Sequence, residues 1–315
     1  MSEDFAVVTA TGSATESPAR ATAPSRSPLR VAAVQHRWHA DRDEHSAALA
    51  DGIATAADLG ARLVALPELT LSPYFAVDPD GPAAGPSQPE DLRSGPTFEF
   101  AAAQASRHSI YLQASLYERA ESEDGLGFNT AIVVGPDGEL ASRTRKLHIP
   151  VTAGYHEDRY FRPGPASADA GGGFPVLEIE QAAFGFPTCW DQWFPELARA
   201  YALEGADVLV YPTAIGSEPD HPQFDTRPQW QAVMVGHAIA NGLFVIATNR
   251  VGFEDPITFY GSSFIADPYG RILVQAPRDR PAVIAADLDL DQRRDWLDLF
   301  PFLATRRPDA YSSLT

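Results

Sequence analysis

The chain has 315 residues, enough for one or two domains and for a large buried core. Its 42 acidic and 24 basic residues leave a net charge of −18, which argues against nucleic acid, because phosphate backbones are bound by clustered Lys and Arg. No apolar run approaches the roughly 20 residues that span a bilayer, so we expect no membrane partner. A single cysteine, and an N-terminus without a basic and apolar leader, predict a cytoplasmic protein.

Residues 1–27 are rich in Ala, Ser, Thr and Pro without apolar periodicity, and we expect them to form a disordered tail. Residues 28–315 contain no linker and predict one domain. Strand-like and helix-like runs alternate within it, which is typical of an α/β fold. The predicted strands cover residues 29–35, 62–66, 110–117, 129–134, 176–183, 208–211, 243–248, 262–266, 271–275 and 282–288. The predicted helices cover residues 49–60, 98–106, 195–204 and 229–240.

Cys189 lies between a strand-like run and a helix-like run, at a predicted strand-to-helix elbow. Such an elbow turns its side chain toward the crevice at the strand ends, where α/β proteins hold ligands. A solitary cysteine is also typical of a small buried apolar residue. Pro187 cannot sit in a central strand ladder, so we expect that the strand ends earlier, near Phe184, or that the elbow is slightly shifted.

Two ionisable residues also follow predicted strands. Glu68 comes directly after the strand at 62–66, and Lys146 follows the strand at 129–134 and its turn. Each of them alone also fits a solvated surface position. A thiol has an ordinary pKa near about 8.5 and needs a neighbouring base or cation to become a useful nucleophile. A base, a cation and a thiol at strand ends therefore predict a thiol-based active site. The eight histidines form no ligand pair with a nearby carboxylate motif, so we expect no metal and no cofactor.

In these contexts Glu68, Lys146 and Cys189 resemble the Glu–Lys–Cys triad of the carbon–nitrogen hydrolase (nitrilase) superfamily, and the resemblance extends from about residue 29 to 311. Four strings resemble its N-carbamoylputrescine amidase branch: residues 189–196, 211–219, 236–241 and 249–252. The resemblance implies a four-layer α-β-β-α sandwich and a homo-oligomer, a dimer or larger. It also implies a second glutamate, matched here by Glu157, that would hydrogen-bond Lys146 and the substrate amide.

The resemblance further implies hydrolysis of a small-molecule amide or ureide. Cys189 would attack the carbonyl carbon, Glu68 would take the thiol proton and later activate water, and Lys146 would stabilise the oxyanion. The branch predicts N-carbamoylputrescine or a related carbamoyl amine as substrate, with amine, carbon dioxide and ammonia as products. The alternatives are an N-carbamoyl amino acid, an aliphatic amide, or a catalytically weak scaffold in which Pro187 misplaces the thiol.

The ammonium group of a carbamoyl diamine requires an acidic partner, and a carbamoyl amino acid instead requires an arginine for its carboxylate. Glu218 is the candidate for the ammonium, with Asp191 and Asp220 in reserve, and Arg250 could bind a carboxylate. Four aromatic residues either line an apolar wall or belong to the core: Trp190, Trp193, Tyr74 and Phe75. The predicted substrate-contacting residues are Trp190, Glu218, Tyr74 and Asp191.

Overall fold

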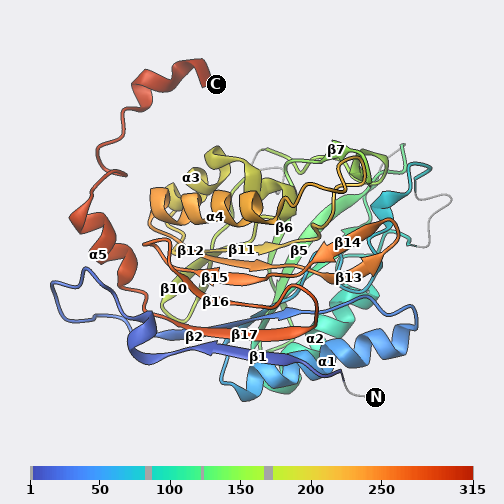
Figure 1. The fold of residues 1–315 in the computed structure, drawn as a ribbon, viewed down its shortest axis with the longest axis horizontal. Helices are drawn as coiled ribbons and strands as arrows, with labels where there is room; N and C mark the ends of the chain where they lie inside the picture. The colour runs from blue at the N-terminus through green and yellow to red at the C-terminus, as the bar shows by residue number, and fades with distance from the viewer. Residues whose placement is uncertain (1–2, 82–86, 122–123, 167–172, 315) are drawn as a thin grey trace.

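The computed structural model describes residues 3–81, 87–121, 124–166 and 173–314, and shows two β-sheets stacked face to face (Figure 1). Within these residues the first sheet has seven strands in the order β1-β17-β2-β3-β4-β5-β6, and the second has six in the order β16-β15-β12-β11-β10-β9. The first sheet consists of β1 (Ala6–Ala10), β2 (Leu29–Gln35), β3 (Leu63–Ala65), β4 (Tyr111–Glu118), β5 (Phe128–Val134), β6 (Leu140–Arg145) and β17 (Ala282–Leu288). The second consists of β9 (Leu177–Ile179), β10 (Ala182–Gly185), β11 (Val208–Pro212), β12 (Phe244–Thr248), β15 (Phe264–Ala266) and β16 (Ile272–Gln275).

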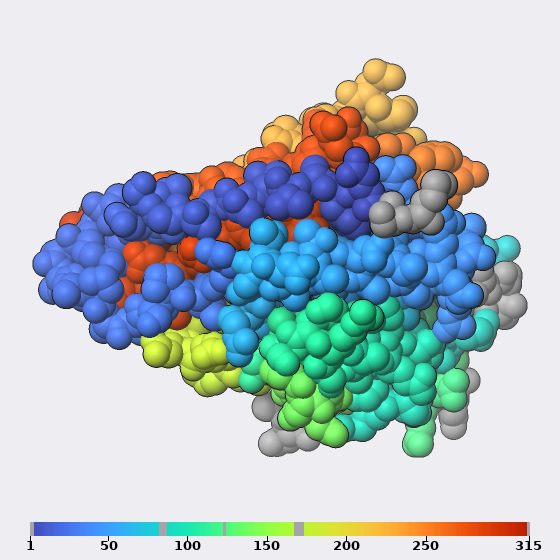
Figure 2. All heavy atoms as spheres, turned by 90° about the horizontal axis from the view of Figure 1, so that it is seen from below, coloured from blue at the N-terminus to red at the C-terminus, as the bar shows by residue number. Residues whose placement is uncertain are grey.

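Helices cover the outer face of each sheet. The helices α1 (Arg42–Asp58) and α2 (Pro96–His108) pack on the first sheet, and Figure 2 shows them covering that side of the molecule. The helices α3 (Pro195–Leu203) and α4 (Arg227–Asn241) pack on the second sheet (Figure 1). The predicted α-β-β-α sandwich is confirmed.

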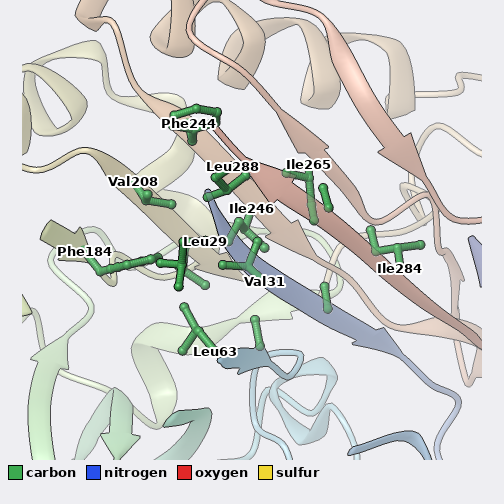
Figure 3. Close-up of a cluster of buried hydrophobic side chains, with 14 of the residues drawn as sticks. Leu29, Val31, Leu63, Phe184, Val208, Phe244, Ile246, Ile265, Ile284 and Leu288 are labelled. Atoms are coloured by element: carbon green, nitrogen blue, oxygen red, sulfur yellow. The ribbon is translucent and has the colours of Figure 1, made fainter. Parts of the chain in front are cut away.

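The inner faces of the two sheets form an apolar core. Leu29, Val31 and Leu63 of the first sheet face Phe184 and Ile246 of the second, as Figure 3 shows. These strands are buried on both faces, which explains why they read as continuous apolar runs rather than alternating ones. Burial of this kind is the main force that holds the layers together.

The N-terminal segment differs from the disordered tail that we expect. Residues 6–10 form the strand β1, which pairs in parallel with β17 at the edge of the first sheet. Arg20 and Arg26 then pair with aspartates, including Asp289 and Asp291, that follow β17 in the sequence. Local composition predicts disorder here, but pairing with a strand about 275 residues away supplies the missing stabilisation.

The run predicted as one strand at 176–183 is a hairpin of β9 and β10, which turns at Glu180 with a left-handed φ of 57°. The strand β10 ends at Gly185, close to the predicted end near Phe184, so Pro187 lies outside the ladder. The parallel strands β3 and β4 belong to the first sheet, and β10, β11 and β12 run parallel in the second.

Several short elements lie outside the two large sheets. They are the pair β7 (Val151–Thr152) and β8 (Tyr155–His156), the pair β13 (Val251–Glu254) and β14 (Ile257–Tyr260), and the 3-10 turns η1 (Gly12–Thr15), η2 (Phe75–Val77), η3 (Glu157–Arg159), η5 (Cys189–Trp193) and η6 (Pro308–Leu314). The helix α5 (Gln292–Leu299) leads into a C-terminal segment that extends away from the body in Figure 1. None of the helices in the described part of the chain combines the length and apolarity needed to cross a membrane.

Candidate active site

Cys189 opens the 3-10 helix η5, four residues after Gly185, the last residue of β10. Its φ of 41° lies in the left-handed region, where a residue with a side chain is strained. The Asp191 carboxylate holds this turn by accepting hydrogen bonds from the backbone N–H of Thr188 at 3.1 Å and of His148 at 3.0 Å. The His148 ring also donates to Asp191, with 2.7 Å between Nδ1 and Oδ1. Asp191, predicted to contact substrate, is instead buried and fixes the cysteine turn.

Glu68, Lys146 and Glu157 form a buried group that we call the carboxylate–lysine cluster. The Lys146 ammonium donates to Glu68 Oε1 at 2.8 Å and to Glu157 Oε2 at 2.7 Å, and all three side chains are fully shielded from solvent. Glu68 follows β3, Lys146 directly follows β6, and Glu157 opens η3 after β8. The structure thus brings together three residues that the sequence separates by up to 89 positions.

Two neutral side chains complete this cluster. The Asn129 amide donates to Glu68 Oε1 at 2.7 Å, and the Tyr74 hydroxyl donates to Glu157 Oε1 at 2.8 Å. Tyr74, predicted to contact substrate, is therefore packed behind Glu157 in an aromatic core together with Phe75. Sequence reasoning does not find Asn129, although it is the first residue of the strand predicted at 129–134. In the structure its carbonyl oxygen accepts a hydrogen bond from the backbone N–H of Lys146 at 2.8 Å.

The surroundings of the thiol favour its protonated form. Burial raises the pKa of Cys189 well above its ordinary value; Glu68 raises it further, and Lys146 opposes this shift. Burial alone would lower the pKa of Lys146, but Glu157 and Glu68 outweigh burial and raise it, so Lys146 stays charged. The thiol therefore keeps its proton at neutral pH until a base removes it. Glu68 Oε2 is buried and has no hydrogen-bond partner among the described residues, so it is an available proton acceptor.

A cavity of about 360 Å³ opens onto the thiol. Its lining residues include Cys189, Glu157, Trp190, Glu218 and, missed by sequence reasoning, Tyr155. Two of the predicted substrate contacts, Trp190 and Glu218, therefore lie at the cavity. Tyr155 could have been found from its place two residues before Glu157.

Glu157 and Glu218 are the only acidic or basic side chains among the described residues that line the cavity. Glu218 accepts a hydrogen bond from the Thr226 hydroxyl at 3.2 Å, and burial raises its pKa. Asp220, the reserve candidate for the substrate ammonium, is exposed and does not line the cavity. Arg250 is buried and does not line the cavity either. Across the described residues, no three or more His, Cys, Asp or Glu side chains are grouped to hold a metal ion.

A four-layer sandwich that gathers a lone thiol, two carboxylates and a lysine at its strand ends has the architecture of the nitrilase superfamily. Residues 30–298 match the model of the carbon–nitrogen hydrolase family, and the chain belongs to this family.

Named relatives give the same result over nearly the whole chain. A citrullinase of Francisella tularensis is 38% identical over 91% of this chain and 98% of its own length. An N-carbamoylputrescine amidase of Arabidopsis thaliana is 37% identical over 81% of this chain and 84% of its own. The crystal structure of a carbon–nitrogen hydrolase from Helicobacter pylori superposes with a TM-score of 0.77 at 36% identity, over 91% of this chain and 98% of that one.

Proposed function

We propose that this protein hydrolyses the ureide group of a carbamoyl amine, with N-carbamoylputrescine as the model substrate. The observation that carries the proposal is that Cys189 and Glu218 line one cavity, whose lining includes no arginine or lysine among the described residues. A carbamoyl diamine has a neutral ureide at one end and an ammonium at the other. The thiol can attack the ureide carbon, and the ammonium can pair with a carboxylate set in a mostly apolar wall.

The first half of the reaction forms a covalent intermediate. Glu68 takes the thiol proton as Cys189 attacks the ureide carbon, and a carbon–sulfur bond forms. The oxygen becomes an oxyanion, which is stabilised by the Lys146 ammonium, a group itself shielded from solvent. The tetrahedral intermediate collapses with cleavage of the bond to the terminal nitrogen, and the proton held by Glu68 leaves with ammonia.

The second half returns the free thiol. Glu68 removes a proton from water, the hydroxide attacks the carbamoyl carbon, and the carbon–sulfur bond breaks with return of the proton to sulfur. The released carbamic acid loses carbon dioxide and yields the amine. Throughout both halves Glu157 keeps Lys146 in place through hydrogen bonds from Nζ to both of its oxygens.

Citrulline is the second candidate substrate, because a relative that matches this chain over 98% of its own length is named citrullinase. Citrulline differs from N-carbamoylputrescine only by a carboxylate on the carbon that bears the amine. Because the described cavity lining contains carboxylates and no cationic side chain, an added carboxylate is repelled rather than paired. The cavity chemistry therefore favours the carbamoyl amine.

Three ureides of equal chain length test this proposal. Ammonia release from N-carbamoylputrescine, citrulline and N-butylurea separates the effect of the ammonium from that of the carboxylate. We expect N-carbamoylputrescine to have the highest kcat/KM, and Cys189→Ala to release no ammonia. Glu218→Gln should lower kcat/KM for N-carbamoylputrescine by about tenfold to a hundredfold and leave N-butylurea nearly unchanged.

The same panel can reject the proposal. A higher kcat/KM for citrulline would identify a carbamoyl amino acid hydrolase, and equal values for N-butylurea would remove the role of Glu218. Ammonia release that survives Cys189→Ala would remove the thiol from the mechanism.

A further inference from the structure

We infer that Arg250, anchored by Glu254, is a positioning residue that holds the catalytic base Glu68, and Tyr74, the hydrogen-bond partner of Glu157, in register with the thiol. The inference rests on the proposed function, because it assigns Glu68 the role of base. Arg250 follows β12 of the second sheet, whereas Glu68 follows β3 of the first. The contact therefore ties together the two sheets at the edge where the site lies.

The Arg250 guanidinium hydrogen-bonds the backbone of the segment that carries Glu68. Its Nη2 donates to the carbonyl oxygen of Glu68 at 3.0 Å, of Leu69 at 2.7 Å and of Ser72 at 2.7 Å, and its Nε donates to the Glu68 carbonyl at 3.2 Å. Leu69 has a left-handed φ of 51°, a conformation that the surrounding contacts must maintain. These bonds fix the peptide groups that directly follow the Glu68 side chain.

Glu254 completes the arrangement from the other side. Its carboxylate accepts two hydrogen bonds from Arg250 Nη1, at 2.8 and 3.0 Å, and one from the backbone N–H of Tyr74 at 2.8 Å. Tyr74 in turn donates to Glu157 of the carboxylate–lysine cluster. The ion pair therefore holds both ends of residues 68–74, and with them Glu68, a member of the cluster, and Tyr74, a hydrogen-bond partner of the cluster.

The preceding residue, Asn249, acts on the opposite wall of the site. Its side-chain Oδ1 accepts from the backbone N–H of Ile215 at 3.0 Å, and its Nδ2 donates to the carbonyl oxygen of Ile215 at 2.9 Å. Ile215 lines the cavity, and the neighbouring Ala214 carbonyl contacts Cys189 Sγ at 4.0 Å. The adjacent side chains of Asn249 and Arg250 thus fix the segment that carries Glu68 and the segment at Ile215, beside the thiol, relative to each other.

This arrangement leaves Arg250 no capacity to bind a substrate carboxylate. Its side chain is 1% exposed, and its six hydrogen bonds go to backbone carbonyls and Glu254. A lysine in its place keeps the charge and loses the planar fork that reaches several acceptors at once. Displacement of a catalytic group by about 1 Å is enough to lower a rate on the order of a hundredfold.

The test compares Arg250→Lys and Glu254→Gln with Arg293→Lys as the matched control. Arg293 also donates to backbone carbonyls, those of Asn241, Gly242 and Ala202, but on the helical layer over the second sheet. We expect each of the first two variants to lower kcat on the order of a hundredfold at nearly unchanged KM. The double variant should be little worse than either, because both act through one segment. Arg293→Lys should keep the wild-type kcat.

Amide hydrogen exchange provides a readout that needs no substrate. Exchange in residues 66–74 should rise at least about tenfold in Arg250→Lys and Glu254→Gln, and should stay at the wild-type rate in Arg293→Lys. If the wild-type protein acts on no ureide, the proposed function fails while the exchange result still decides whether Arg250 holds this segment. Unchanged exchange overturns the inference. So does a loss of activity that only follows the loss of folded protein, or a raised KM with kcat intact.

Discussion

Glu157 is buried between Lys146 and Tyr74, and burial disfavours the charged form of its carboxylate. Burial raises the pKa of Glu157 to about 7; Lys146 opposes this rise and Glu68 adds to it. The carboxylate–lysine cluster contains two carboxylates and one ammonium, so one negative charge has no local counterion within it. The proton affinity of Glu157 therefore belongs to the whole cluster.

This shift predicts a pH dependence of stability. From the ordinary value of 4.5 to about 7, folded Glu157 binds its proton more tightly than unfolded Glu157. The free energy of unfolding should therefore decrease as pH rises through that window, by about 3 kcal/mol at most, and should lose this slope in Glu157→Gln. Urea unfolding of both proteins from pH 4.5 to 8 measures the difference between their slopes. Parallel curves would show that Glu157 titrates at its ordinary value.

At the same scale, the sequence locates the residues to which we assign the reaction better than it locates the residues that surround them. Glu68, Lys146 and Cys189 each follow a strand, and this position is readable from local patterns. Tyr74 and Asp191 have the chemistry of substrate contacts, but their roles depend on partners 83 and 43 residues away, Glu157 and His148. Only the folded chain shows which polar atom each of them faces.

Among the helices and strands, those specified by local sequence are predicted, and those that depend on distant partners are missed. Long apolar runs predict the central strands of both sheets, because those strands are buried on both faces. The strand β1 is missed because its five residues lie in a Ser- and Pro-rich segment and depend on β17 for pairing. The helix α5 is missed because four of its eight residues are charged and only three, Trp296, Leu297 and Leu299, are apolar.

At the cysteine elbow the sequence and the structure agree on where the strand before Cys189 ends. Pro187 removes a backbone donor, and the structure ends β10 two residues earlier, so the ladder loses nothing. The turn that follows is held by Asp191, whose carboxylate satisfies the N–H groups of Thr188 and His148. The proline therefore does not by itself disturb the position of Cys189.

Across the whole molecule, the N-terminal segment ties the edge of the first sheet to the region after β17. Arg26 pairs with Asp207 at 2.9 Å and with Asp291 at 3.3 Å, and both aspartates are nearly buried. In a chain of net charge −18, these aspartates depend on arginines brought from a distant part of the sequence. The segment thus contributes to stability without contacting the cavity.

Arg26→Gln tests this role. Because it leaves two nearly buried carboxylates with fewer partners, it should lower the free energy of unfolding by about 1–2 kcal/mol, with ammonia release per folded molecule unchanged. The matched control is Arg307→Gln, which breaks an exposed pair with Asp309 and should leave unfolding as in the wild type. Equal unfolding curves for all three proteins, measured in urea, would show that the N-terminal segment is not a stabilising element.

The role of Glu68 as base can be measured directly by ammonia release from N-carbamoylputrescine by Glu68→Gln, with thermal melting as the check on folding. The variant keeps an oxygen that can accept from Lys146 and Asn129 but has no carboxylate to take the thiol proton. The account predicts a kcat lower by on the order of a thousandfold, with KM little changed. A folded Glu68→Gln protein whose kcat stays within about tenfold of the wild type would contradict it.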